Sequence, residues 1–312
     1  MNYLITGGAG FIGSNLIDYI LENDKNCKII VIDTLLFDTY KYIKNKKVDF
    51  INGNVTDEVL SMKLCKNIDV VFHLAANSGV IPSIKNPRLD RKYNVDGVFN
   101  YLESSARNGV EKFIFASSGS VLGEKDELLH EEMAARPESP YSASKLAGEA
   151  YCYAYYKSFG LNTTALRFSN VYGPYSFHKK LNLIPKYMMD RLSNNDKFCV
   201  YGDGYQTRDF IYVKDLVRAL YLFATTETEK GGLFQMASGV YYEINKVLDI
   251  LEKTMNKHCK NKIELVYKPM RKGEVKNTRV DNTKFLNTFK DFNFTDLETG
   301  LNETSEWYAK NW

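Results

Sequence analysis

The sequence predicts an α/β fold in which a doubly wound parallel sheet is followed by a smaller α/β domain. Three observations support this prediction. Short, nearly continuous apolar runs alternate with helical segments over the first half of the 312 residues, a pattern typical of strands buried on both faces. A glycine-rich turn closes the first apolar run. After about residue 170 the alternation becomes irregular, loops lengthen and prolines appear, which indicates a second domain.

Each expected strand of the first domain is a short apolar run bounded by turn residues or by a helical segment. These strands are expected at residues 3–6, 28–33, 48–53, 68–74, 113–117 and 162–167. Apolar residues at helical spacing predict a first helix over 11–21, and two longer helices are expected near 94–108 and 141–159. In the second domain, short strands are expected at 197–201 and 263–267.

Composition and charge argue against several classes of protein. The formal net charge is +3, with no basic cluster of the size that nucleic-acid binding requires. No apolar run reaches the roughly 20 residues of a membrane-spanning helix, and the N-terminus has no signal-peptide pattern. The five cysteines include no C-x-x-C pair, and the four histidines share no metal-ligand spacing. We therefore expect a cytoplasmic protein without a metal site, a nucleic-acid partner or a membrane anchor.

The turn after the first strand, residues 7–13, has the sequence GGAGFIG and opens the first helix. It satisfies both the G-x-x-G-x-x-G and the G-x-G-x-x-G spacing. Glycines let a pyrophosphate approach backbone N–H groups closely, and the helix N-terminus adds partial positive charge. In this strand–turn–helix context the motif predicts a Rossmann-type dinucleotide site. The residues expected to hold the cofactor here are Gly7, Gly10, Phe11, Ile12 and Gly13.

Asp33 ends the second strand, roughly 20 residues beyond the glycine turn, where dinucleotide-binding folds carry an acidic residue. Its carboxylate can accept hydrogen bonds from the adenosine ribose and repels a 2′-phosphate, which favours NAD over NADP. The alternative interpretation is a strand-end aspartate that caps the next turn. We expect NAD as the cofactor.

Tyr141 and Lys145 lie four residues apart at the start of an expected helix and so share one of its faces. A free tyrosine has a pKa of about 10 and is a poor base at neutral pH. A nearby ammonium group and an oxidised nicotinamide favour the phenolate, which can take a hydroxyl proton while a hydride leaves the same carbon. Ser118 follows the fifth strand, at the edge where open α/β sheets bind ligands.

Taken in order, these segments resemble the NAD-dependent epimerase/dehydratase family of extended short-chain dehydrogenase/reductases, and most of all its UDP-glucose 4-epimerase branch. The matching segments are 6–13, 53–57, 73–76, 94–97, 117–123, 141–145, 167–174, 201–213 and 271–274. The resemblance implies an NAD-binding Rossmann domain over residues 1–170. Residues 171–312 then form mainly a nucleotide-sugar-binding domain, with some segments returning to the first.

The resemblance also implies roles for individual residues. Ser118 matches the family's catalytic serine, which also contacts substrate, Tyr141 matches the base, and Lys145 matches the lysine that holds the nicotinamide ribose. Further cofactor positions are Asn54, Val55, Leu74, Ala75, Ala76 and Asn94. Positions that hold the substrate's nucleotide diphosphate are Asn170, Asn182, Leu183, Arg208, Arg271 and Glu274. Asn54 and Glu274 stand where the family usually has Asp, and Leu122 replaces a frequent Tyr.

The two residues after Ser118 discriminate between reactions of the family. The 4,6-dehydratases usually carry an Asp-Glu pair there, the decarboxylases tend to keep a Glu at the second position, and the 3,5-epimerising reductases use a Cys at the first. Gly119 and Ser120 supply none of these groups. The leading hypothesis is a nucleotide-sugar 4-epimerase, in which a transient 4-keto sugar is reduced again from its other face.

Two alternatives stay open. A C4 dehydrogenase acting on a nucleotide-linked sugar such as a heptose would release the 4-keto sugar for surface-polysaccharide or capsule biosynthesis, and would need an external oxidant to recover NAD. A non-catalytic NAD-binding regulator is disfavoured by the intact serine, tyrosine and lysine. The resemblance also implies a homodimer, because the family pairs two long helices per subunit, which correspond to 94–108 and 141–159.

Overall fold

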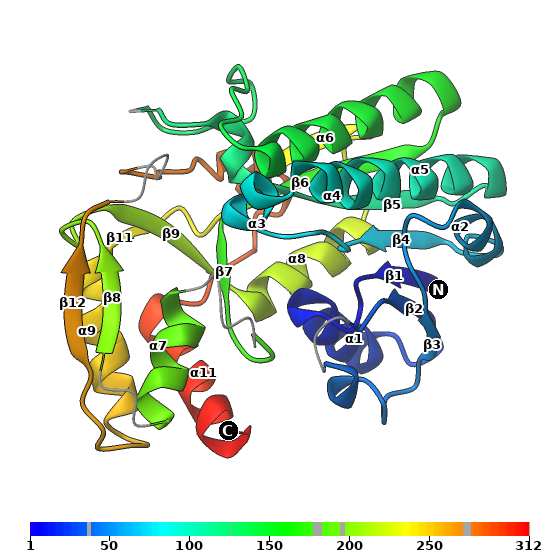
Figure 1. Ribbon diagram of the computed structural model, residues 1–312. Coiled ribbons are helices and arrows are strands. Elements are labelled where there is room, and N and C mark those ends of the chain that lie inside the picture. The colour runs from blue at the N-terminus through cyan, green and yellow to red at the C-terminus, as the bar shows by residue number, and fades with distance from the viewer. Residues whose placement is uncertain (36–38, 126, 177–182, 194–196, 271–275, 312) are drawn as a thin grey trace. The chain divides into compact units, whose positions relative to one another are not determined.

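The computed structural model describes residues 1–35, 39–125, 127–176, 183–193, 197–270 and 276–311 (Figure 1). The chain divides into two compact units. The first comprises Met1–Gly123, Ala134–Phe168 and Val217–Gln235, and the second comprises Glu124–Met133, Ser169–Leu216 and Met236–Trp312. Each unit is therefore assembled from separate segments, and Val217–Gln235 joins the first unit although it follows residue 170.

The first unit is built on a seven-stranded sheet of order β10-β6-β5-β4-β1-β2-β3. Its strands are β1 Asn2–Thr6, β2 Lys28–Asp33, β3 Asp49–Asn52, β4 Val70–His73, β5 Lys112–Ser118, β6 Asn162–Phe168 and β10 Gly232–Met236. All ladders that join β6 through to β3 are parallel. The predicted parallel α/β fold is confirmed, and the six expected strands all form, with ends that differ by at most two residues. The seventh strand, β10, was not expected from the sequence.

Helices cover both faces of this sheet (Figure 1). One face carries α2 Glu58–Leu64, α5 Gly97–Asn108 and α6 Pro140–Phe159, and the other carries α1 Phe11–Asn23 and the end of α8 Val213–Thr225. Apolar side chains fill the space between the sheet and α2, α5 and α6, among them Val71, Phe113 and Phe115 from the strands. The strand order reverses at β1, which lies between β2 and β4. Ligands of such sheets bind beyond the carboxyl ends of the strands at this point.

The two long helices of the first unit begin and end with recognisable signals. The expected helix near 94–108 starts as a π-helical segment, Lys92–Asp96, which follows α3 Val80–Lys85 and α4 Pro87–Arg91 and runs into α5. The α6 helix starts after Ser139, whose hydroxyl accepts a hydrogen bond from the Ser142 N–H and so caps the helix. Both α5 and α6 end at a glycine with positive φ, at Gly109 and Gly160.

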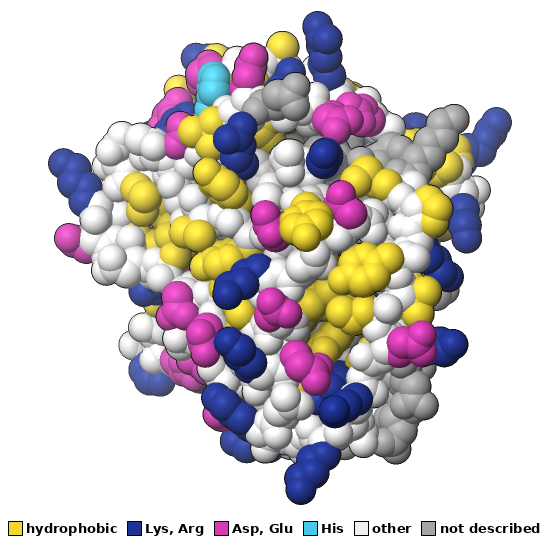
Figure 2. All heavy atoms as spheres, turned by 90° about the vertical axis from the view of Figure 1, so that its left-hand side faces the viewer, with side chains coloured by type: hydrophobic (Ala, Val, Ile, Leu, Met, Phe, Trp, Pro, Cys, Tyr) yellow, Lys and Arg dark blue, Asp and Glu magenta, His cyan; other side chains and the backbone are white. Residues whose placement is uncertain are grey.

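The second unit combines two small sheets with helices. A three-stranded sheet contains β11 Tyr241–Glu243, β9 Thr207–Tyr212 and β7 Asn170–Tyr172, and a parallel pair contains β12 Glu264–Lys268 and β8 Lys197–Tyr201. The helices are α7 Leu183–Leu192, α9 Ile244–Met255, α10 Thr283–Thr288 and α11 Leu297–Asn311. The two strands expected in this domain are confirmed as β8 and β12. Figure 2 shows the side that carries them, where apolar side chains lie among Lys, Arg, Asp and Glu. Within the described residues, no helix has the length and apolar character needed to cross a bilayer.

Candidate active site

The glycine turn between β1 and α1 is shaped by close backbone contacts. Gly7 has a φ of +67°, and a Cβ atom there would lie 2.8 Å from the Cα atom of Ala75. A Cβ atom on Gly13 would lie 2.5 Å from the Cα atom of Gly8. Gly10 caps α1, so the next N–H groups, from Phe11 onward, belong to the helix's first turn and have no partner within it. The packing of the turn therefore requires glycine at positions 7 and 13, and the N–H groups at the start of α1 are donors of the kind that a pyrophosphate accepts.

Asp33 holds this turn from the end of β2. One carboxylate oxygen accepts a hydrogen bond from the Ala9 N–H at 3.1 Å, and the other accepts one from the Leu35 N–H at 3.0 Å. Burial raises the pKa of this carboxyl, and the backbone donors oppose the rise. The aspartate thus has the local capping role that the sequence left as an alternative. Each oxygen has a further lone pair with which to accept a ribose hydroxyl.

Five of the other expected cofactor residues, at 54–55 and 74–76, follow the carboxyl ends of β3 and β4. The Asn54 side-chain oxygen accepts hydrogen bonds from the N–H and the hydroxyl of Thr56, both at 3.0 Å. Val55 is buried. Leu74, Ala75 and Ala76 continue from β4, and the Ala75 N–H donates to the hydroxyl of Thr6 on β1 at 3.1 Å. The structure therefore brings the β4 segment directly against the glycine turn.

Ser118, Tyr141 and Lys145 come together where β5 ends and α6 begins. The Tyr141 hydroxyl is hydrogen-bonded to Ser118, and the Lys145 ammonium lies 5.8 Å from the centre of the tyrosine ring. Lys145 also donates to the Ala116 carbonyl oxygen at 2.7 Å, which anchors it to β5. The spacing of four residues predicted that the tyrosine and lysine share a helix face. The fold places the third candidate, Ser118, beside them.

Burial sets the protonation of this pair. It raises the pKa of Tyr141 to about 12, although the hydrogen bond from Ser118 works in the opposite direction. It lowers the pKa of Lys145 to about 8, with the carboxylates of Asp90 and Glu149 opposing that effect. The protein alone therefore leaves the tyrosine protonated at neutral pH. The positive charge of a bound oxidised nicotinamide is the further contribution that would favour the phenolate.

Asn94 lies in the π-helical segment behind this pair, where its side chain is bound by the protein itself. Its amide nitrogen donates to Asp90 at 2.9 Å and to the Ser144 hydroxyl at 3.2 Å. Its side-chain oxygen accepts a hydrogen bond from the Asn77 N–H at 2.7 Å. Asn94 thus ties α4, α6 and the segment after β4 together, which is consistent with a supporting position beside the cofactor.

Apart from Ser118, which lies in the first unit, the described candidates for substrate binding lie in the second unit. Asn170 opens β7 and donates to the Asp209 carbonyl oxygen at 2.9 Å, and Leu183 opens α7. Arg208 on β9 donates to the carbonyl oxygens of Thr207 at 2.8 Å and Lys276 at 3.0 Å. The remaining candidates, Asn182, Arg271 and Glu274, lie outside the described residues.

The sequence comparison with protein families matches residues 3–237 to the family described as "NAD dependent epimerase/dehydratase family". This chain belongs to that family. It is an NAD-dependent enzyme of the extended short-chain dehydrogenase/reductase type, and NAD is its cofactor.

Three relatives illustrate the match. A putative UDP-glucose 4-epimerase of Methanocaldococcus jannaschii is 33% identical over 311 residues, covering 99% of this chain and 98% of that protein. The crystal structure of UDP-glucose 4-epimerase from Thermotoga maritima with UDP-glucose is 32% identical, with a TM-score of 0.91 and coverage of 100% and 99%. UDP-glucuronic acid 4-epimerase from Bacillus cereus, in complex with UDP-glucuronic acid and NAD, is 29% identical with a TM-score of 0.91 and full coverage of both chains.

Three side chains near Tyr141 were not identified from the sequence as part of the site. Asp90 is 1% exposed and faces the Tyr141–Lys145 pair, while Ser120 and Ser142 are hydrogen-bonded to one another behind Ser118. The sequence holds only weak signals for them. Asp90 precedes Asn94 by one helical turn and Ser142 directly follows Tyr141, but such spacings are common by chance.

Proposed function

We propose that this enzyme is a nucleotide-sugar 4-epimerase. The observation that supports the proposal best is the set of Ser118, Tyr141 and Lys145 around one point, with Gly119 and Ser120 next to the serine. This set serves one reversible oxidation of a secondary alcohol. The residues at 119 and 120 carry no carboxyl or thiol for the elimination, decarboxylation or additional epimerisation steps of related enzymes.

In this mechanism the Tyr141 phenolate accepts the proton from the sugar O4 while the C4–H bond breaks and a carbonyl forms. Bound NAD supplies the hydride acceptor. Lys145 remains protonated, stabilises the phenolate and holds the nicotinamide ribose. After the 4-keto sugar rotates, the hydride returns to the opposite face of C4 and Tyr141 gives the proton back to O4. No net proton or electron leaves the site in one turnover.

We propose a nucleoside diphosphate sugar as the substrate, with Arg208 and Arg271 binding the diphosphate. A guanidinium group pairs two phosphate oxygens through parallel hydrogen bonds. A UDP-sugar is the first to test, because the Thermotoga maritima enzyme was crystallised with UDP-glucose and the Bacillus cereus enzyme with UDP-glucuronic acid. A charge-assisted hydrogen bond contributes about 1.5–3 kcal/mol, so Arg208→Ala should weaken UDP binding roughly tenfold or more by calorimetry.

The test of the reaction uses the purified enzyme with UDP-glucose and UDP-glucuronic acid. A 4-epimerase converts each active substrate into a mixture of two stereoisomers, detected by chromatography, without a lasting rise in reduced-nicotinamide absorbance. A C4 dehydrogenase stops after one turnover with reduced cofactor, and resumes when a 2-keto acid oxidant is supplied. A protein that binds NAD but changes no sugar nucleotide in either assay would contradict both and favour a regulator.

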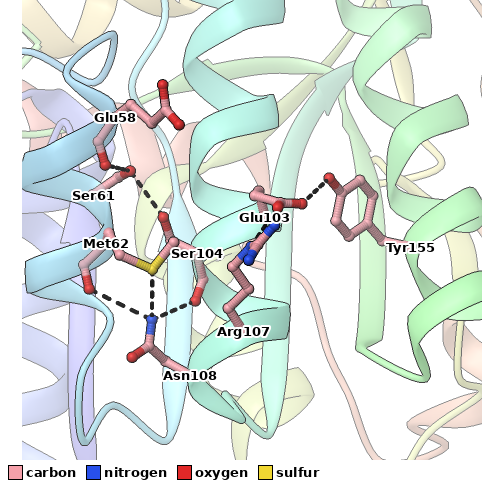
Figure 3. A network of polar contacts seen from close by, with 8 residues as sticks. All are labelled: Glu58, Ser61, Met62, Glu103, Ser104, Arg107, Asn108 and Tyr155. Carbon is pink, nitrogen blue, oxygen red and sulfur yellow. Dashed lines mark hydrogen bonds and ion pairs between the residues drawn. The ribbon is translucent and has the colours of Figure 1, made fainter.

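We further propose that two copies of this chain pair through α5 and α6. Their outer surface carries a ladder of aromatic rings, in which Phe99 meets Tyr151 and Tyr155 edge to face, and Tyr155 meets Phe159. Phe99 is 39% exposed and Phe159 is 64% exposed, so the ladder is available to a second copy. Figure 3 shows Tyr155 donating to Glu103 across the two helices. Light scattering at micromolar concentration should give twice the chain mass, and Phe99→Asp should give the single mass.

A further inference from the structure

A row of four serine hydroxyls runs from the start of α6 to the catalytic tyrosine. Ser139 lies 2.9 Å from Ser142, Ser142 lies 3.0 Å from Ser120, and Ser120 lies 3.0 Å from Ser118, all measured between Oγ atoms. Ser118 in turn is hydrogen-bonded to Tyr141. The row joins the N-terminus of α6 to the end of β5, and Ser139 and Ser142 in it are buried.

The direction of the first half of this row follows from its geometry. The Ser142 hydroxyl donates to Ser120 and so uses its one hydrogen. In the contact between Ser139 and Ser142, Ser139 is therefore the donor. The Ser139 oxygen accepts a hydrogen bond from the Ser142 N–H at 3.1 Å, which holds this end of the row in place.

The direction of the second half depends on the charge of Tyr141. A phenolate can only accept, so Ser118 must donate to it, and Ser120 must then donate to Ser118. Ser118 also accepts a hydrogen bond from the Ser120 N–H at 3.3 Å, so both of its lone pairs are then used. In that arrangement all four hydroxyl hydrogens point along the row toward Tyr141.

The opposite arrangement, in which the hydrogens of Tyr141 and Ser118 point toward Ser120, leaves one serine hydrogen without a place in the row. If protonated Tyr141 donates to Ser118 and Ser118 donates to Ser120, the Ser120 hydroxyl accepts from both sides and its own hydrogen points out of the row. Within the described part of the chain, the Ser120 hydroxyl is hydrogen-bonded to the hydroxyls of Ser118 and Ser142. A neutral Tyr141 oxygen can also accept from Ser118, but the hydrogen bond to a phenolate is charge-assisted and stronger, and hydrogen bonds in such a chain strengthen one another.

We propose that Ser120 and Ser142 are positioning residues for catalysis, which orient the hydrogen of Ser118 toward Tyr141 and so stabilise its phenolate. The inference deepens the proposed function, since it concerns the base of that reaction. The role is separate from substrate binding, because it acts through Ser118 and can be measured without a substrate.

Charged and titratable groups around the base must be considered with the row. Lys145 of α6 favours the phenolate, and the carboxylate of Asp90 on α4 disfavours it. Glu149 of α6 and His73 of β4 both face Lys145, and burial lowers the pKa of His73 to about 3, so that it stays neutral. These groups are unchanged when a serine of the row is replaced, so a change in the titration of Tyr141 reports on the hydroxyls.

The experiment is a titration of the NAD-bound enzyme by the ultraviolet absorbance of tyrosinate, from which the curve of NAD-bound Tyr141→Phe is subtracted. Ser120→Ala and Ser142→Ala should each raise the midpoint of Tyr141 by up to about one pH unit, because a neutral hydrogen bond contributes about 0.5–1.5 kcal/mol. Ser120→Thr keeps the hydroxyl and should restore the midpoint. With an active sugar nucleotide, the low-pH limb of kcat should move in the same direction and by a similar amount.

Ser104→Ala is the matched control. Ser104 is buried, and its hydroxyl contacts that of Ser61 at 2.9 Å on the α2 side of α5 (Figure 3). This variant loses a buried serine hydroxyl outside the row and should leave the midpoint unchanged. An unchanged midpoint in Ser120→Ala, or an equal change in Ser104→Ala, would overturn the proposal. Because no sugar is present in the titration, failure of the proposed reaction leaves this result interpretable.

Discussion

The two ends of the candidate site in the first unit are held in different ways. At the glycine turn, the shape comes from backbone packed on backbone, and a single added carbon on Gly13 would lie within 2.5 Å of a neighbouring Cα atom. At the catalytic end, the shape comes from side-chain hydrogen bonds, such as that of Lys145 to the Ala116 carbonyl. The cofactor end is therefore sensitive to added atoms, whereas the catalytic end is sensitive to the loss of polar groups.

The largest effect is expected at the catalytic end, for Tyr141→Phe. The variant loses the base, and general acid–base catalysis typically contributes 10²–10⁴-fold, so kcat should fall by about that factor. NAD affinity, measured by calorimetry, should stay close to that of the wild type, because the glycine turn is unchanged. Tyr153→Phe removes a hydroxyl from a 54% exposed tyrosine of the same helix and serves as the control. Near-normal turnover of Tyr141→Phe would refute the assigned mechanism.

The second effect tests whether side-chain contacts at the catalytic end also stabilise the folded protein. Arg167 of β6 makes a two-pronged ion pair with Glu149 of α6 at 2.8 and 2.9 Å, and both residues are buried. Glu149→Gln leaves the guanidinium buried without its counter-charge, which costs about 3 kcal/mol or more in the free energy of unfolding. Urea denaturation measures the loss. Glu103→Gln, which weakens a pair with the exposed Arg107, should cost much less.

The third effect is expected when one carbon atom is added to the glycine turn at the cofactor end. Gly13→Ala introduces a Cβ atom into the closest contact of the turn, and overpacking of this kind costs typically 1–3 kcal/mol. NAD affinity should fall roughly tenfold or more, while kcat at saturating NAD changes less. The same substitution at Gly119 meets its nearest atom at 3.7 Å, so Gly119→Ala should bind NAD normally. Equal NAD affinities for the two variants would contradict the steric argument.

The smallest effect concerns Asp33, whose carboxylate accepts a hydrogen bond from the turn and which we propose favours NAD over NADP. Asp33→Ala removes the negative charge that repels a 2′-phosphate, so the preference for NAD over NADP should narrow several-fold. Affinities for both dinucleotides measure this. Asp49→Ala, which removes an exposed aspartate on the neighbouring strand, should leave the ratio unchanged. Tighter binding of NADP than NAD by the unchanged enzyme would remove the basis of this prediction.

Residues whose role depends on backbone conformation or on neighbours in one local segment could be predicted from the sequence. The glycine turn, Asp33, and the Tyr141–Lys145 pair depend on the spacing of nearby residues and on the strand–helix order, which the structure confirms as a parallel α/β fold. Strands that are short and not purely apolar could not be predicted in this way. β7, β9, β10 and β11 have no clear periodicity and were missed, because pairing with distant strands stabilises them rather than local propensity.

Contacts between segments distant in the chain were decided only by the tertiary structure. The fold class, which the structure confirms, and the candidate dinucleotide turn and base could be inferred from the residues alone, since each depends on local spacing. The sequence did not determine that Ser142 of α6 would donate to Ser120 beyond β5, or that Asp90 of α4 would face Tyr141 and Lys145. These groups meet because parallel strands bring the starts of different helices to one edge of the sheet, and side chains buried there must find hydrogen-bond partners from other segments.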